Sequence, residues 1–177
     1  MFRSLSLAIA AFASVASAQA QRIPDLTLAP GEAVTIQFDE AGAAGAPVRS
    51  PARWSSFDVE VARQMSGMTP PDAPQADAIP LDAITSGRPE PIPSNLIRVR
   101  LLSIAGRHAM LVVENGQGRA LAYRARMTAD GQTRSTDVCT VLPRLPGYEH
   151  WPHPVERIVL SDFRLIPWAP GRAPVCE

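Results

Sequence analysis

The chain has 177 residues with 17 basic and 17 acidic side chains, so its formal net charge at neutral pH is zero. A nucleic-acid-binding protein usually carries a strongly basic footprint, and this balance argues against nucleic acid as a main partner. The length suits one domain with a real hydrophobic core. Every basic side chain is an arginine, and alanine and proline are abundant, which is typical of GC-rich bacterial coding.

Residues 1–18 have the three parts of a secretory signal peptide in the usual order. Arg3 and the α-amino group form a short positive region, residues 5–15 are mostly apolar, and residues 16–18 are small. We expect cleavage after Ala18, with a second cleavage position after Ala20. A membrane anchor would need about 20 apolar residues, roughly twice this stretch. The chain is therefore expected to be periplasmic or secreted, with no membrane span.

The two cysteines, Cys139 and Cys176, form an even pair in a chain that we expect to be exported. Oxidising compartments favour disulfides, and with two cysteines the pairing within one chain is forced. We expect this bond to attach the C-terminal tail to the body of the domain. Two free thiols, or a bond between two chains, are the alternatives.

Residues 19–177 are expected to form a single β domain, and its first clear strand covers residues 32–39. There, apolar Val34, Ile36 and Phe38 alternate with polar residues, as in a half-buried strand.

In residues 54–68 the alternation of Phe57, Val59 and Val61 favours a strand. Ser55 and Asp58, however, have the spacing of a helix capping box, and the apolar residues also fall near helical spacing. We favour the strand. Residues 67–94 contain seven prolines, and we expect a loop excursion there because proline fixes φ and lacks a donor.

From residue 96 onward the sequence predicts an antiparallel meander. The expected strands are residues 96–104, 109–114, 121–128 and 133–141, followed after an irregular proline-rich connection by a last strand at 155–166. Asp130-Gly131 predicts a tight hairpin turn, since such turns need positive φ.

Short strands at this spacing predict an all-β fold, namely an antiparallel immunoglobulin-like β-sandwich of about seven strands. A small β-barrel is the alternative. The strand–turn–strand pattern of residues 111–116 and 121–123 is similar to that of bacterial immunoglobulin-like sandwiches. The resemblance is architectural and carries no family-specific motif.

The histidines are the first candidates for chemistry. His150 and His153 flank Trp151-Pro152, and Glu149 precedes them. Imidazole and carboxylate groups bind Zn²⁺ or Cu²⁺, but a complete site needs further ligands, and His108 is the one remaining imidazole. Pro152 also restricts how the two side chains converge. We therefore assign no metal site and no cofactor.

Arginines on two predicted strands are the second candidates. Arg98 and Arg100 share one face of the first strand of the meander, and Arg124 and Arg126 share one face of the third. If these strands belong to one sheet, the four guanidinium groups form an anion-binding patch. The competing interpretation is an ordinary polar sheet face whose arginines pair with Asp58 and Glu60, or with Asp137.

No catalytic motif is present: there is no nucleophile elbow, phosphate loop or dinucleotide fingerprint. We therefore expect an exported, non-enzymatic β-sandwich module that binds or packs against a cell-envelope protein or glycan. The alternative is a small secreted hydrolase or metal-dependent protein using the His150/His153 region. The oligomeric state does not follow from the sequence.

Overall fold

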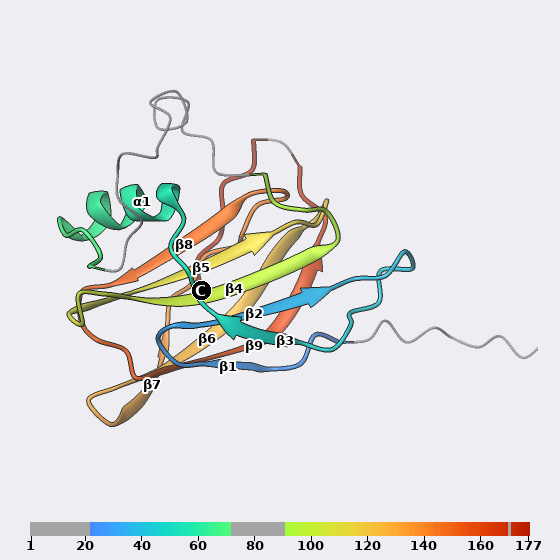
Figure 1. The fold of residues 1–177 in the computed structure, drawn as a ribbon. Coiled ribbons are helices and arrows are strands. Elements are labelled where there is room, and N and C mark those ends of the chain that lie inside the picture. The colour runs from blue at the N-terminus through green and yellow to red at the C-terminus, as the bar shows by residue number, and fades with distance from the viewer. Residues whose placement is uncertain (1–21, 72–90, 170) are drawn as a thin grey trace, which may run out of the picture.

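The computed structural model describes residues 22–71, 91–169 and 171–177 (Figure 1). The expected signal peptide at 1–18, both of its cleavage positions, and most of the proline-rich segment 67–94 lie outside the described residues. Within the described ranges, no helix is long and apolar enough to cross a membrane.

The described residues are mostly β, with nine strands and one helix. In chain order the elements are β1 (Leu26–Leu28), β2 (Glu32–Gln37), β3 (Val48–Pro51), α1 (Ser56–Ser66), β4 (Leu96–Ile104), β5 (His108–Asn115), β6 (Ala120–Ala129), β7 (Gln132–Thr136), β8 (Pro146–Trp151) and β9 (Arg157–Ile166).

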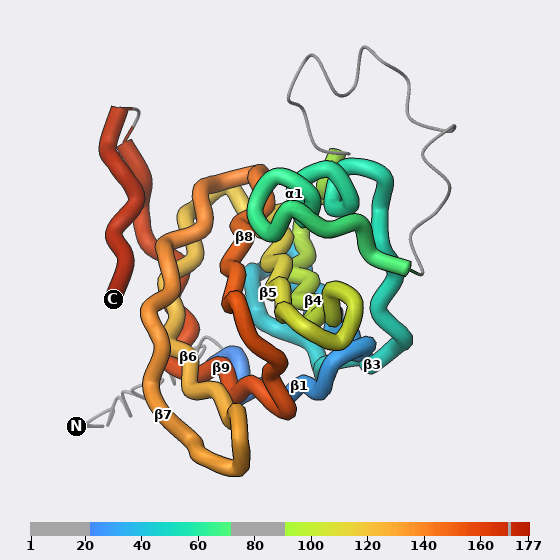
Figure 2. Tube along the Cα trace, turned by 90° about the vertical axis from the view of Figure 1, so that its left-hand side faces the viewer, coloured from blue at the N-terminus to red at the C-terminus, as the bar shows by residue number. Residues whose placement is uncertain are grey.

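The strands form two antiparallel sheets. The smaller sheet has the order β1-β9-β6-β7, and the larger sheet has the order β3-β2-β4-β5-β8. Figures 1 and 2 show the two layers, with α1 lying outside the larger sheet above β5 and β8. The expected β-sandwich architecture is confirmed, and the two described sheets do not join into one closed barrel.

The core lies between the sheets and takes alternate residues from each strand. In β4, Ile97, Val99 and Leu101 are fully buried in it, and the residues between them face outward. In β6, Tyr123 and Met127 belong to the same core. Fully burying one large apolar side chain stabilises a fold by about 1.5–3 kcal/mol, and a one-residue slip would turn every such side chain to the solvent. The core therefore fixes which residues reach each outer face.

The predicted meander is wrong at the connection between β5 and β6. The β4–β5 and β6–β7 hairpins form as expected, and Asp130 and Gly131 have the positive φ values of 51° and 69° that the second hairpin turn needs. After β5, however, the chain crosses from the larger to the smaller sheet. Fully buried Asn115 holds this crossing, because its Nδ2 donates to the carbonyl oxygens of Arg119 and Leu142 at 2.8 and 3.1 Å.

The strand favoured for residues 54–68 is also wrong, since Ser56–Ser66 is helix α1. The capping box decides the outcome. The Ser55 side chain accepts from the Asp58 N–H at 3.1 Å, and the Asp58 carboxylate accepts from the Ser55 N–H at 2.8 Å. Gly67, with φ of 71°, ends the helix in the left-handed conformation that favours glycine. These caps satisfy backbone groups that the ends of a helix otherwise leave without partners.

Strand β8 falls within the connection that we expected to be irregular. Pro146 is its first residue, and β8 is the last strand of the larger sheet, so the missing N–H of the proline costs no ladder hydrogen bond. The other short strands that the sequence pattern missed, β1 and β3, also lie at sheet edges.

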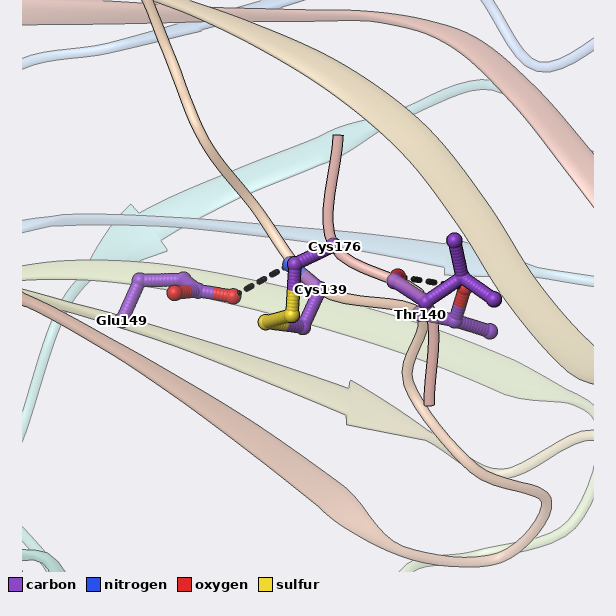
Figure 3. Close-up of a disulfide and its surroundings, with 5 residues drawn as sticks. Cys139, Thr140, Glu149 and Cys176 are labelled. Atoms are coloured by element: carbon purple, nitrogen blue, oxygen red, sulfur yellow. Dashed lines mark hydrogen bonds between the residues drawn. A yellow bond between two sulfur atoms is a disulfide. The ribbon is translucent and has the colours of Figure 1, made fainter. Parts of the chain in front are cut away.

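The C-terminal tail is attached to the body by the expected disulfide between Cys139 and Cys176 (Figure 3). Residues 138–140, predicted near the end of a strand, pair with this tail instead, and Val141 forms a bridge with Leu121 of β6. Thr140 N–H donates to the Val175 carbonyl at 2.8 Å. Beside the bond, Glu149 accepts from the Cys139 N–H at 2.7 Å, and burial raises the pKa of that carboxyl. The disulfide is thus part of a small folded unit.

Reduction of the disulfide, or the paired substitutions Cys139→Ser and Cys176→Ser, is expected to lower the free energy of unfolding by about 3–4 kcal/mol. The reason is that the bond closes a loop spanning 37 positions in the unfolded chain. Thermal denaturation with and without dithiothreitol measures the effect. An unchanged melting temperature, with thiol titration showing full reduction, would contradict it.

Candidate functional site

The outer face of the larger sheet changes character along its strands. At one end it is apolar, and Leu102, Met110 and Val112 pack there beneath Ala62 of α1. At the other end it is charged, with Arg98 and Arg100 on β4 and Glu114 on β5. The helix therefore sits on the apolar end, and its N-terminus meets the charged end.

A buried ion pair joins this N-terminus to the sheet. Arg100 Nη1 donates to Asp58 Oδ2 at 2.6 Å, and Arg100 Nη2 donates to Oδ1 at 3.2 Å. The side chains of Arg100 and Asp58 are only 8% and 1% exposed. Arg100 Nη1 also donates to the backbone carbonyl of Arg53 at 2.7 Å, which ties down the segment just before the helix. Asp58 consequently both caps α1 and fixes it to β4.

Glu114 and Arg98 extend the ion pair across the sheet. They stand directly opposite each other in the β4–β5 register, and both oxygens of Glu114 accept from Arg98. Glu114 Oε2 also lies 3.6 Å from Arg100 Nε, which makes no hydrogen bond to any described residue. The charges alternate in one row, Asp58–Arg100–Glu114–Arg98, and compensate one another.

Aromatic side chains flank this row. Tyr148 on β8 donates its hydroxyl to Asp58 Oδ1 at 3.2 Å and lies beside Phe57, with 6.2 Å between the ring centroids. Burial, and next the nearby Asp58 carboxylate, raise the pKa of Tyr148 far above its ordinary value. The hydroxyl therefore stays protonated and remains a donor. Trp54 packs from the segment before α1.

The charged row and the aromatic rings surround a hollow of about 530 Å³ that opens to solvent, here called the α1 pocket. Its walls come from β2, β3, β4, β5, β8 and the start of α1. The residues lining it are Ala33, Ser50, Pro51, Arg53, Trp54, Ser55, Phe57, Asp58, Ile92, Arg98, Arg100, Glu114, Pro146 and Tyr148. A pocket with a few convergent polar groups is the usual form of a small-ligand site.

The four-arginine patch considered from the sequence does not form on one face. Arg98 and Arg100 lie on the larger sheet, in the α1 pocket, whereas Arg124 and Arg126 lie on β6 in the smaller sheet. The condition that their strands share one sheet is not met, because the chain crosses between sheets after β5.

The histidines are brought together in a different pair from the one the sequence pattern indicated. His108 Nδ1 and His150 Nε2 lie 2.9 Å apart, while His153 faces Arg134 and the Pro154 carbonyl. The centroids of the His108 and His150 rings are 5.1 Å apart. This is close to the largest centroid separation that a 2.9 Å contact between two ring nitrogens permits, so the two nitrogens point at each other along the line between the rings. Two ligands of one metal ion would instead both turn toward a common point beside that line.

No group of three or more histidine, cysteine, aspartate or glutamate side chains suited to a metal ion occurs within 22–71, 91–169 and 171–177. Trp151 is buried in the main core, and Trp168 lies beneath the guanidinium of Arg172. Neither tryptophan lines the α1 pocket.

The sequence indicated Asp58 as a partner for the strand arginines, and its ion pair with Arg100 confirms that alternative. It did not indicate Glu114 or Tyr148 as members of a site. A signal existed for Glu114, since a carboxylate at the end of the apolar run of β5 needs a partner once it is buried. For Asp58 the capping-box spacing was visible, but its second partner, Arg100, is 42 positions away.

No protein-family model matches the chain, and no curated protein or solved structure was found to be similar to it. The site must therefore be judged from its own geometry.

Replacing Arg100 by methionine is expected to lower the free energy of unfolding by about 3–5 kcal/mol, because it leaves the Asp58 carboxylate buried without its counter-ion. The matched control is Arg124→Met, whose partner Asp162 lies 3.9 Å away with both side chains about two-thirds exposed. It should cost no more than about 1 kcal/mol. Urea denaturation of both variants measures the difference, and equal losses would contradict the structural role of the pair.

The His108–His150 pair is expected to make stability depend on pH. Burial, and next the neighbouring His108, lower the pKa of His150. The folded chain therefore binds a proton there less readily than the unfolded chain, and the stabilisation is complete above about pH 6.5 and lost as the pH falls through the lowered pKa. Thermal denaturation between about pH 5 and 8 should show this loss in the wild type and a flatter profile in His150→Gln. Identical profiles would contradict the assignment.

Proposed function

We propose that this chain is an exported, non-enzymatic β-sandwich module that binds a glycan of the cell envelope in the α1 pocket. The observation that carries the proposal is the convergence of a compensated charge row and aromatic rings on one open hollow of about 530 Å³. The middle of the helix packs on an apolar sheet face, whereas its N-terminus borders this polar hollow.

The charge row favours a ligand rich in hydroxyl groups. Two arginines and two carboxylates alternate in it, so donors and acceptors are both within reach while the row carries no net charge. A sugar hydroxyl both donates and accepts, as that arrangement requires. The Nε of Arg100 is buried and faces Glu114 Oε2 at 3.6 Å, so it stays within the row, and Arg98, whose side chain is 40% exposed, is the donor of the row that a ligand can reach.

The aromatic wall supports the same ligand class. Trp54 and Phe57 line the pocket beside Tyr148, and amphipathic rings such as Trp and Tyr suit surfaces that are apolar on one side and wet on the other. The apolar face of a sugar ring and its hydroxyl rim have that character. An anionic polymer would gain little here, since both arginines of the row already have carboxylate partners.

Export and the immunoglobulin-like assignment belong to the same proposal. The disulfide supports an oxidising compartment, periplasmic or extracellular, which is where the leader sequence would direct the chain. Two packed antiparallel sheets with apolar inner faces support an immunoglobulin-like relationship.

The alternative function, a small hydrolase or metal-dependent protein using His150 and His153, has less support. It needs the two imidazoles to converge, whereas His150 contacts His108, and His153 contacts Arg134.

Filling the pocket is the direct test of the proposed function. Ser50 lines the pocket from the edge strand β3, so Ser50→Phe should reduce binding without touching the charge row. The probe is purified peptidoglycan sacculi, a glycan-rich envelope polymer, and binding is measured by co-sedimentation with soluble neutral oligosaccharides as competitors. We expect the wild type to pellet and Ser50→Phe to lose at least tenfold in affinity, about 1.4 kcal/mol.

The matched control is Ser135→Phe, the same change on the exposed edge strand β7 of the other sheet. It should bind like the wild type. Failure of the wild type to pellet with sacculi, or equal binding by both variants, would count against a glycan site in the pocket.

A further inference from the structure

The outer face of the smaller sheet differs from that of the larger sheet because no described element covers it. Figure 2 shows α1 over the larger sheet only, on the far side of the sandwich from β6 and β9. On β6, Tyr123, Ala125 and Met127 point into the core, so Arg124 and Arg126 point outward, and both are exposed.

Strand β9 adds two more arginines to this face. Arg157 stands opposite Thr128 and Arg164 opposite Ala122 in the β6–β9 register, and both are exposed. A β-bulge in β9 places Arg164 on this face. The register with β6 shifts between Ala122 and Arg124, and Asp162 in β9 has a φ of 53°. The extra residue lets Phe163 turn into the core while Arg164 stays outside.

These four residues, Arg124, Arg126, Arg157 and Arg164, are here called the arginine face. One ion pair in the described structure involves them, between Arg124 and exposed Asp162 at 3.9 Å. The carboxylates beside these arginines are Asp162, next to Arg124, and Glu32 and Glu156, which line a hollow together with Arg157 and Arg49. Five arginines against three carboxylates leave a local excess of positive charge, in a chain whose acidic and basic side chains are equal in number. This contrasts with the compensated row in the α1 pocket.

The spacing of the arginine face suits repeated anionic groups on a plane. Residues two apart on one strand stand about 7 Å apart, and neighbouring strands are about 4.8 Å apart. At one end a hollow of about 300 Å³ is lined by Arg22, Arg124 and Arg164, together with Ile23, Asp25, Asp162 and Phe163. Three guanidinium groups against two carboxylates leave this hollow positive, and guanidinium binds phosphate oxygens in a bidentate manner.

We propose that the arginine face docks on the phosphate headgroups of an anionic lipid surface. Charge complementarity carries the inference, and the spread of the arginines over two neighbouring strands favours an extended surface over an enclosed ligand. The site is independent of the α1 pocket, since it lies on the other sheet and shares no residue with it. Because it has no large exposed apolar residue, the attraction is electrostatic and is screened by salt.

The test uses the exported protein with vesicles of phosphatidylcholine alone and of phosphatidylcholine mixed with phosphatidylglycerol. We expect co-sedimentation with the anionic vesicles at low ionic strength, none with phosphatidylcholine alone, and release by about 0.5 M salt. An arginine near an anionic membrane contributes about fivefold in affinity, so the double variant Arg126→Gln/Arg157→Gln should bind about 25-fold more weakly. Neither arginine has an ion-pair partner among the described residues, so this double variant should fold.

The matched control is Arg107→Gln/Arg144→Gln, which removes the same charge from exposed positions on other loops and should bind like the wild type. Absence of binding to anionic vesicles, or equal weakening by both double variants, would overturn the proposal. Binding to heparin without binding to vesicles would overturn it too, by assigning the face to an anionic glycan. Ser50→Phe should leave vesicle binding unchanged, so this result and the test of the α1 pocket can fail separately.

Discussion

The ion pair between Arg100 and Asp58 is the constraint on which the arrangement of α1 depends. An arginine buried on a sheet face is costly unless a carboxylate meets it there, and the carboxylate that does so comes from the first turn of the helix. Because the same aspartate, Asp58, also caps the helix, this one residue fixes the start of α1 at a defined position on the sheet. The apolar contacts of Ala62 then hold the rest of the helix against β4 and β5.

Fixing α1 in this way gives the sandwich two unlike outer faces. On the larger sheet the helix and the charge row enclose a polar pocket; the row itself is compensated, and exposed Arg53 adds one further positive charge at its wall. On the smaller sheet the arginine face stays open and carries excess positive charge. Binding a neutral glycan on one face and an anionic membrane surface on the other would place the module between two layers of the envelope. The disulfide attaches the C-terminal tail to the segment that follows β7.

The sequence predicted those features that depend on local pattern or on simple counting. The inward residues of β4, the Asp130-Gly131 hairpin and the Cys139–Cys176 bond all follow from alternation, turn chemistry and an even cysteine count. It failed where two local patterns conflict, and where distant contacts decide. The alternation of Phe57, Val59 and Val61 resembles a strand, but the caps at Ser55 and Gly67 favour a helix. Similarly, nothing local shows that the chain changes sheets after Asn115, which separates Arg98 and Arg100 from Arg124 and Arg126.

The most direct test is a double-mutant cycle on the ion pair, with Asp58→Asn, Arg100→Met and the two changes combined. Asparagine keeps the shape and an acceptor for the helix cap, so the cycle isolates the charge interaction between α1 and β4. If the pair fixes the helix on the sheet, the unfolding free energies measured in urea should show a coupling of about 1–3 kcal/mol. A coupling near zero, with the two single losses simply adding, would contradict this account of how α1 and its pocket are held.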